Sequence, residues 1–329
     1  MISLSAWCLL IVVSVLGAAE SYVMRFNQPG GARTSFMAAV EGNEGSRVKL
    51  IKFDGGGIFF WYQAGACKYL QEAGFLNHSN LSVLGTSAGA LSATLLVCEC
   101  DFDKAADIAI GQCIRENLFE KPTGLMFQWG AIIEEWLDIL LSESLETEDG
   151  DESRNKLSRL IVTATAMKTL LPWRDKKQTF LSGFCNKEDL INACMSSVHI
   201  PLFLDKKLYT KYYRSTREGK RYDRYIDGSF WPYFGKNPTE VPRALIKSCE
   251  GEASSVLSPE EIYVVGDWKA DRDFAAKVEG DDTGFVSLVT PEGLFEMVRS
   301  GYEFMKSEHT AGRVPLSVLP PVMSEKIIC

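Results

Sequence analysis

The segment from Val48 to Val97 constrains the fold more than any other part of this 329-residue chain. A short apolar run, 48–53, leads into three glycines and then into a helical pattern. A second apolar run, 81–84, leads into Gly85-Thr86-Ser87-Ala88-Gly89 and the helix-forming stretch 90–97. Two successive units of strand, glycine-rich turn and helix are typical of a parallel sheet covered by helices. We therefore expect an α/β fold.

The rest of the chain continues the alternation of strands and helices. Apolar runs predict further strands at 160–165, 179–182, 225–227 and 262–265. Periodic apolar residues predict helices near 103–119, 131–142, 187–196 and 291–306. Between them, an acidic run at 143–152 predicts a solvated loop, and a basic, tyrosine-rich run at 206–224 predicts a solvated hairpin.

Ser87 lies at the centre of a G-x-S-x-G motif, between a predicted strand and a predicted helix. A nucleophilic serine needs such a tight turn because the turn exposes its hydroxyl, and the flanking Gly85 and Gly89 let neighbouring segments approach closely. The N-terminus of the following helix also stabilises negative charge at the serine. The motif therefore predicts that Ser87 is a nucleophile.

Gly55, Gly56 and Gly57 precede this motif and also open a predicted helix. Their backbone N–H groups are not shielded by side chains, as an oxyanion hole requires. A phosphate-binding loop would need either Lys-Ser/Thr after the glycines or G-x-G-x-x-G spacing, and the sequence has neither. We expect these glycines to bind an oxyanion.

Asp227 is the candidate base for Ser87. It follows the apolar pair Tyr225-Ile226 and precedes Gly228, at the end of a predicted strand. An Asp-Gly pair alone is usually a turn, so Asp227 gains its weight from the two glycine motifs upstream. A buried aspartate can accept a proton from serine without a histidine when desolvation raises its pKa. The chain has three histidines, which argues against a histidine-rich metal site: His78, His199 and His309.

Together these motifs resemble the patatin-like phospholipase family. Four blocks occur in the family's order within Val48 to Phe234, and they are Asp54-Gly55-Gly56-Gly57, Gly85-Thr86-Ser87-Ala88-Gly89, the small-residue block 193–203 and Asp227-Gly228-Ser229. The resemblance implies a three-layer α/β/α sandwich with a mostly parallel central sheet. It also implies lipid acyl hydrolase activity by a dyad of Ser87 and Asp227, without histidine.

The predicted reaction is hydrolysis of a carboxylic ester in a glycerolipid, which is a phospholipid, a galactolipid or an acylglycerol. Asp227 would accept the Ser87 proton, an acyl-enzyme would form, and water would release a fatty acid, with no metal or other cofactor. Two alternatives remain open. Ser87, Asp227 and His309 follow the order of an α/β-hydrolase triad. Phe60 stands where many family members have glycine, which leaves open a weakly active or inactive lipid-binding protein.

The N-terminus predicts a targeting sequence. Residues 1–19 are typical of a secretory signal peptide, because Ile2 to Ala19 carry no charge and end in small residues, although an uncleaved membrane anchor is an alternative. Residues 20–47 are expected to form a flexible leader. The hydrolase domain should span 48–329, with a motif-bearing part at 48–234 and a C-terminal helical part at 235–329. We expect a protein that is secreted or lumenal and that can associate with a membrane. A two-part plastid targeting sequence is the alternative.

Charge and surface residues indicate the partners. A formal net charge of −8 excludes a general nucleic-acid binder, which needs a basic surface. The substrate should be met at a membrane or droplet surface, where anionic lipid could contact Lys206, Lys207, Lys211 and Arg214. The aromatic run 59–62 is expected to be core. Apolar spacing predicts that several cysteines are buried thiols, and Asn77 and Asn80 begin acceptor sequons for glycosylation of a secreted chain.

Overall fold

The structure is a computed structural model of the chain. It describes residues 48–75, 81–121, 126–145, 150–167, 176–216, 219–230, 241–246, 256–280 and 289–316. The predicted signal peptide and leader (1–47) lie outside these ranges, as do both sequons, at Asn77 and Asn80. The secretory location therefore stays a prediction. In the described ranges, no helix is both long and apolar enough to cross a membrane.

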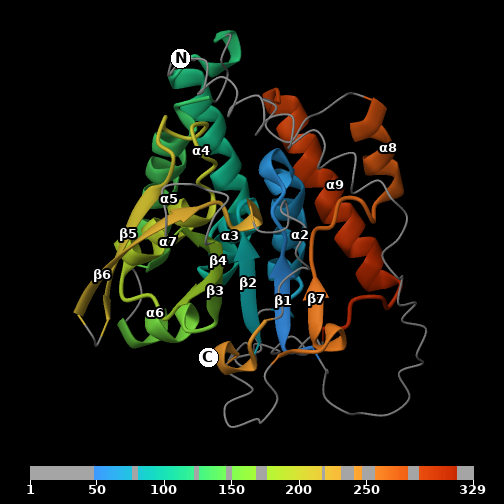
Figure 1. Cartoon of the computed structure of the whole chain (residues 1–329). Coiled ribbons are helices and arrows are strands. Elements are labelled where there is room, and N and C mark those ends of the chain that lie inside the picture. Colours follow the sequence, from blue (N-terminus) through green and yellow to red (C-terminus); the bar gives the residue numbers. More distant parts are fainter. Residues whose placement is uncertain are drawn as a thin grey trace, which may run out of the picture.

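A seven-stranded sheet organises the described part of the chain (Figure 1). At its centre β1 (Leu50–Phe53) pairs in parallel with β2 (Ser82–Thr86) and with β7 (Ile262–Val264), and β2 pairs in parallel with β3 (Leu160–Met167). On the other side, β4 (Lys176–Ser182) and β6 (Gly219–Ile226) pair antiparallel with β3, and β5 (Thr210–Thr216) forms a hairpin with β6. The α/β prediction with a mostly parallel central sheet is confirmed.

Alternation along the central strands assigns the two faces of the sheet, because successive side chains of a strand point to opposite sides. Ile51, Phe53 and Val83 contact the main helical core. Leu50, Leu84 and Ile161 face the other way, against a smaller cluster contributed by Val241, Ile246 and Leu257. In the described residues the second cover is therefore made by short segments around 241–246 and 256–257 rather than by long helices.

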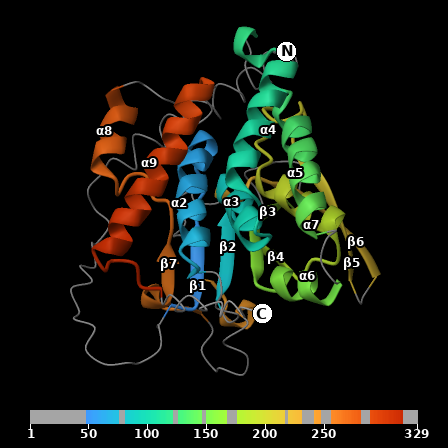
Figure 2. The ribbon, with the colours of Figure 1, turned by 180° about the vertical axis from the view of Figure 1, so that it is seen from behind.

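The helices gather on one face of the sheet, as Figure 2 shows from behind. They are α2 (Phe60–Glu72), α3 (Ala88–Val97), α4 (Phe102–Arg115), α5 (Trp129–Leu145), α6 (Gly150–Leu157), α7 (Lys187–Ser197), α8 (Arg272–Gly280) and α9 (Pro291–Thr310). Asp101, Asn186 and Thr290 cap α4, α7 and α9 by accepting hydrogen bonds from first-turn N–H groups.

The α2–α9 pair packs unusually closely. A Cβ atom added at Gly65 of α2 would lie 1.9 Å from the carbonyl oxygen of Val298, and one at Gly301 of α9 would lie 1.9 Å from the carbonyl oxygen of Tyr62. Each helix therefore presents a glycine to the backbone of the other. This contact attaches the C-terminal part of the chain to the first helix after the predicted oxyanion loop.

Two local predictions need correction or extension. The acidic run at 143–152 is not one loop, because α5 continues to Leu145 and α6 begins at Gly150. The strands predicted at 179–182 and 225–227 are longer, since β4 begins at Lys176 and β6 at Gly219. The predicted basic hairpin is present as β5 and β6.

The cysteines Cys67, Cys98, Cys100 and Cys194 are buried thiols, whereas Cys113 is half-buried and Cys185 is exposed.

Candidate active site

The pairing of β3 explains how Ser87 and Asp227 meet. β4 occupies one edge of β3 along its length, from Ile161 to Met167. On the other edge β2 ends with Thr86 opposite Thr163, and β6 ends with Ile226 opposite Thr165. The two strands therefore approach each other from opposite directions along the same edge, and the next residues are Ser87 and Asp227. The Ser87 Oγ atom donates a hydrogen bond of 2.5 Å to the Asp227 Oδ2 atom.

Ser87 has the backbone of a strained strand-to-helix turn. Its φ is 53° and its ψ is −127°, and α3 begins at the next residue. Its N–H donates to Ser197 Oγ at 2.8 Å, and Ser197 Oγ in turn donates to the carbonyl oxygen of Thr163 at 2.7 Å. The side chain is only 4% exposed. Such a positive φ costs a residue other than glycine about 1–3 kcal/mol, which the surrounding bonds must offset.

We expect Ser87→Gly to be more stable than Ser87→Ala. Both variants lose the hydroxyl, but alanine keeps the strain at a φ of 53° and glycine does not. The difference in the free energy of unfolding should be about 1 kcal/mol in favour of Ser87→Gly, measured by urea denaturation. Equal stabilities, or a more stable Ser87→Ala, would mean that this turn stores no strain.

Asp227 is a buried carboxylate held from several sides. It is 3% exposed, and its Oδ1 atom accepts a hydrogen bond of 2.7 Å from the N–H of Ser229. Its own N–H donates to the carbonyl oxygen of His199 at 2.8 Å. Burial raises the pKa of Asp227 to about 6, against the lowering effects of the hydrogen bonds from Ser87 and Ser229. The carboxyl group is therefore mostly ionised at neutral pH yet remains a stronger base than an exposed aspartate.

The pH profile of any reaction that needs ionised Asp227 should have an acid limb near pH 6. Below that pH the carboxyl group is protonated and cannot accept a proton, so kcat/KM should fall about tenfold per pH unit. The Ser229 hydroxyl lowers this pKa, so Ser229→Ala should move the acid limb to higher pH. Kinetics from pH 4.5 to 8.5 on one soluble ester would check the position of the limb in the wild type and its shift in Ser229→Ala. A limb that moves to lower pH in Ser229→Ala would contradict the contact between the Ser229 hydroxyl and the Asp227 carboxyl group.

The glycines on either side of Ser87 are required by close packing. A Cβ atom at Gly85 would lie 2.2 Å from the carbonyl oxygen of Gly89, and one at Gly89 would lie 2.4 Å from that of Phe53. The first contact closes the turn, and the second seats the start of α3 on the end of β1. Both glycines therefore occupy the positions that the G-x-S-x-G motif predicts.

The loop after β1 brings its glycines beside Ser87. A Cβ atom at Gly55 would lie 3.1 Å from Ser87 Cβ, and Gly57, with a φ of 54°, lines the same cavity as Ser87. Gly56 is less constrained, because an added Cβ would make only ordinary contacts. No described residue accepts a hydrogen bond from the N–H of Gly56 or Gly57. The loop thus places N–H donors next to Ser87, and their binding of an oxyanion stays a prediction.

Gln63 holds this loop, and sequence reasoning missed it. Its Nε2 atom donates to the carbonyl oxygen of Asp54 at 2.8 Å, and its Oε1 atom accepts from Ser92 Oγ at 2.9 Å. The buried amide therefore ties the start of the glycine loop to both α2 and α3. The available signal was a lone amide in the apolar stretch 58–67. Ser197, which binds the Ser87 N–H, was also missed.

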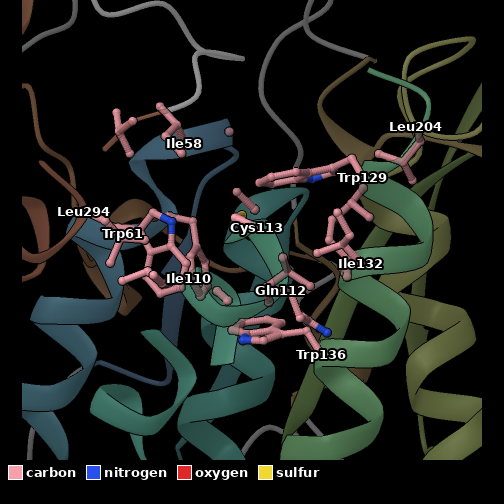
Figure 3. A pocket seen from close by; sticks show the side chains of 18 of the residues that line it. Ile58, Trp61, Ile110, Gln112, Cys113, Trp129, Ile132, Trp136, Leu204 and Leu294 are labelled. Atoms are coloured by element: carbon pink, nitrogen blue, oxygen red, sulfur yellow. The ribbon is translucent and has the colours of Figure 1, made fainter. Parts of the chain in front are cut away.

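An apolar cavity opens from Ser87 between α2, α4 and α5 (Figure 3). The space, including its open mouth, is about 1040 Å³. Its wall includes Phe60, Trp61, Ile132 and Trp136. The aromatic run 59–62 is buried as predicted, yet two of its members also face this cavity. The Phe60 ring packs edge-on against Trp61 and Trp136, with centroids 4.7 and 5.5 Å apart, so this departure from the family pattern forms part of the cavity wall.

The two described histidines differ in position. His199 is buried next to the site, since its carbonyl oxygen accepts the hydrogen bond from the Asp227 N–H described above. His309, in the last turn of α9, is half-buried. Its Nδ1 atom lies 2.6 Å from the Tyr69 hydroxyl, and its ring packs on Phe75. Tyr69 is nine residues after Phe60 on α2, about 13 Å along the helix axis from the cavity end.

Comparison with known proteins assigns the class. Residues 52–241 match the family model of patatin-like phospholipases. The match covers more than half of the chain, so the protein belongs to the patatin-like phospholipase family, whose members are generally lipid acyl hydrolases or acyltransferases.

Individual relatives are more distant. The chain is 28% identical to the human omega-hydroxyceramide transacylase over 182 residues, which are 55% of this chain and 30% of that protein. It is also 28% identical to the mouse omega-hydroxyceramide transacylase over 183 residues, 55% of this chain and 27% of that protein. The chain thus spans less than a third of the length of either relative. VipD from Legionella pneumophila is similar with a TM-score of 0.39 and 14% identity, over 80% of this chain and 67% of that one.

Proposed function

We propose that this protein hydrolyses carboxylic esters of glycerolipids through an acyl-enzyme on Ser87, with Asp227 as the base. The observation that carries the proposal is the 2.5 Å hydrogen bond from Ser87 Oγ to Asp227 Oδ2 at the wall of an apolar cavity. The cavity suits a fatty acyl chain because apolar side chains form nearly all of its wall. Family membership supports a lipid ester as the substrate.

In the first half-reaction, Ser87 Oγ attacks the ester carbonyl carbon and its proton passes to Asp227. The carbonyl oxygen becomes an oxyanion, which the N–H groups of the Gly55–Gly57 loop stabilise. When the intermediate collapses, the ester C–O bond breaks and Asp227 returns the proton to the leaving alcohol. The acyl group is now an ester of Ser87.

In the second half-reaction, water loses a proton to Asp227 and attacks the acyl-Ser87 carbonyl carbon. Collapse releases a fatty acid, and the proton on Asp227 returns to Ser87 Oγ. A lipid alcohol in place of water would give acyl transfer, which is the activity named for the two ceramide relatives. The choice between water and alcohol is therefore part of the test below.

A Ser-Asp-His triad with His309 is the weaker assignment. Asp227 bonds Ser87 directly, which leaves no place for an imidazole between the two side chains. His309 instead contacts Tyr69 and Phe75 at the other end of α2. Phe60, the motive for an inactive protein, packs within the cavity wall and is compatible with an acyl chain there.

We also propose that the cavity mouth faces the membrane or droplet that holds the substrate. Among the described residues, four exposed large apolar side chains either line the cavity or lie within two positions of a lining residue: Ile114, Phe119, Phe127 and Phe295. The ammonium group of Lys206 lies 5.2 Å from the centre of the Phe127 ring, which adds a positive charge to this rim. Lys207 is paired with Asp205 at 2.7 Å, Lys211 is exposed, and the Arg214 side chain lies outside the described part.

Lipid product analysis tests the proposal. The purified full chain is incubated with mixed phospholipid, galactolipid and acylglycerol vesicles, with and without a long-chain alcohol, and the products are measured by mass spectrometry. We expect free fatty acid from at least one class, and none with Ser87→Ala. Acyl-alcohol formed in place of fatty acid would make the protein a transacylase, and lipids left intact by a folded chain would contradict the proposal.

A further inference from the structure

One polar side chain in the cavity has no role in the reaction described so far. Gln112 lies on α4 and lines the cavity with Ile110, Ile132 and Trp136, as Figure 3 shows. It is 3% exposed, and within the described part of the chain neither its amide nitrogen nor its amide oxygen has a hydrogen-bond partner. Gln112 and Ser87 are the only described lining residues whose side chains carry an oxygen atom.

The neighbours of Gln112 do not satisfy its amide. The indole N–H of Trp136 donates to the carbonyl oxygen of Ala105 at 2.8 Å and is therefore occupied. The Arg115 guanidinium lowers the pKa of the Glu135 carboxyl most, and the Gln112 amide, which lies near Glu135 but outside hydrogen-bond geometry, lowers it least. However, Arg115 binds both Glu135 oxygens, at 3.0 and 2.5 Å, and no hydrogen bond joins Glu135 to the Gln112 amide.

An unpaired amide in an apolar cavity is costly in the empty protein and disfavours a plain hydrocarbon ligand. A buried donor or acceptor without a partner costs about 1–3 kcal/mol, and an alkyl chain packed against it would also exclude water from it. A hydroxyl group fits both ends of the amide, since it can donate to Oε1 and accept from Nε2. The ligand that relieves this cost is therefore an acyl chain that carries an oxygen.

We propose that Gln112 selects acyl chains that bear a hydroxyl group on the hydrocarbon, by hydrogen-bonding that hydroxyl while the ester carbonyl lies at Ser87. The proposal rests on the proposed acyl-ester chemistry and specifies its substrate. Gln112 is then a specificity residue: it contacts the acyl chain and takes no part in bond making. The distance between Ser87 and the Gln112 amide along the cavity determines which carbon of the acyl chain must carry the hydroxyl group.

A competition experiment tests the selection. The full chain receives a mixture of glycerol monoesters of octadecanoic acid, one unsubstituted and the others with a single hydroxyl at successive chain positions. Mass spectrometry of the released acids gives the ratios of kcat/KM. We expect at least one hydroxylated ester to be preferred over the unsubstituted ester by about tenfold or more. No preference at any position would overturn the proposal.

Variants assign the preference to the amide. Gln112→Met keeps the side-chain length and removes both polar atoms, so kcat/KM should fall far more for the hydroxylated ester than for the unsubstituted ester, and the preference should disappear. Ile110→Leu changes the cavity wall but keeps the amide, so both rates should change together and the ratio should persist. If the preference survives in Gln112→Met, the amide does not select the substrate. If Gln112→Met loses stability and cleaves all esters more slowly by the same factor, Gln112 has only a structural role.

A binding measurement separates this inference from the proposed function. Ser87→Ala and the double variant Ser87→Ala/Gln112→Met are titrated calorimetrically with free octadecanoic acid and with its hydroxylated forms. We expect one hydroxylated acid to bind Ser87→Ala about tenfold more tightly than octadecanoic acid, and the double variant to lose this difference. If the wild type cleaves no ester but Ser87→Ala shows this binding difference, the proposed hydrolysis is refuted and the role of Gln112 is not. If Ser87→Ala binds all the acids equally, the role of Gln112 is refuted and the proposed hydrolysis is not.

Discussion

Ser87→Ala should lower kcat/KM for a soluble ester by about four orders of magnitude or more while the protein stays folded. The hydroxyl is the group that forms the covalent bond, so its loss leaves only substrate binding and the N–H donors of the glycine loop. Alanine at position 87 adds no backbone strain beyond that of serine, because both residues carry a Cβ at a φ of 53°. The unfolding midpoint and the circular dichroism spectrum should therefore change little.

The matched control for this variant is Ser92→Ala. Ser92 is a buried serine on α3 whose hydroxyl donates to Gln63 and not to Asp227. It should retain far more activity than Ser87→Ala although it also loses a buried hydroxyl. If Ser87→Ala kept a substantial fraction of the wild-type rate, another residue would have to be the nucleophile.

Asp227→Asn should cost nearly as much activity as Ser87→Ala, and the double variant should cost little more than either single one. Members of a catalytic unit fail together, since each is ineffective without the other. Asparagine preserves the shape of the side chain but cannot accept the proton. Because burial raises the pKa of Asp227 to about 6, the ionised carboxylate destabilises the fold above that pH, so the neutral asparagine should be at least as stable as the wild type at pH 7.

His309→Ala provides the comparison for Asp227→Asn, measured by turnover of the same ester with folding checked by circular dichroism. Its contacts are with Tyr69 and Phe75, so it should change stability modestly and the turnover number little. A folded His309→Ala protein that lost several orders of magnitude in rate would favour the triad. An active Asp227→Asn protein would remove Asp227 from the mechanism.

Local signals explain what the sequence predicted well. The turn around Ser87 and the loop at Gly55 are fixed by short-range requirements, namely glycines where backbones approach and a strand that leads into a helix. Asp227 was proposed as the base for Ser87 from its place at a strand end and from the two glycine motifs, and the family resemblance supported this pairing. Its physical cause, the shared edge of β3 on which β2 and β6 converge, depends on strand pairing between distant segments, which no local pattern specifies.

Other features escaped prediction for identifiable reasons. Helix α6 lies in a strongly charged stretch with almost no apolar stripe, so its periodicity gives no signal. Gln63 and Gln112 are both amides on otherwise apolar helix faces, and the sequence cannot distinguish them. Gln63 has two hydrogen-bond partners and holds the glycine loop, whereas Gln112 has none among the residues that the structure describes and lines the cavity.

Covalent labelling of Ser87 tests the central claim most directly. The purified full chain is treated with a fluorophosphonate, which reacts with activated serine hydroxyls, and the adduct is located by peptide mass spectrometry. The geometry of Ser87 and Asp227 predicts one adduct, on Ser87, formed much more slowly in Asp227→Asn and at the wild-type rate in His309→Ala. A folded wild-type protein that stays unlabelled at Ser87, or that is labelled there equally fast without the Asp227 carboxylate, would contradict the assignment of these two residues as a catalytic dyad.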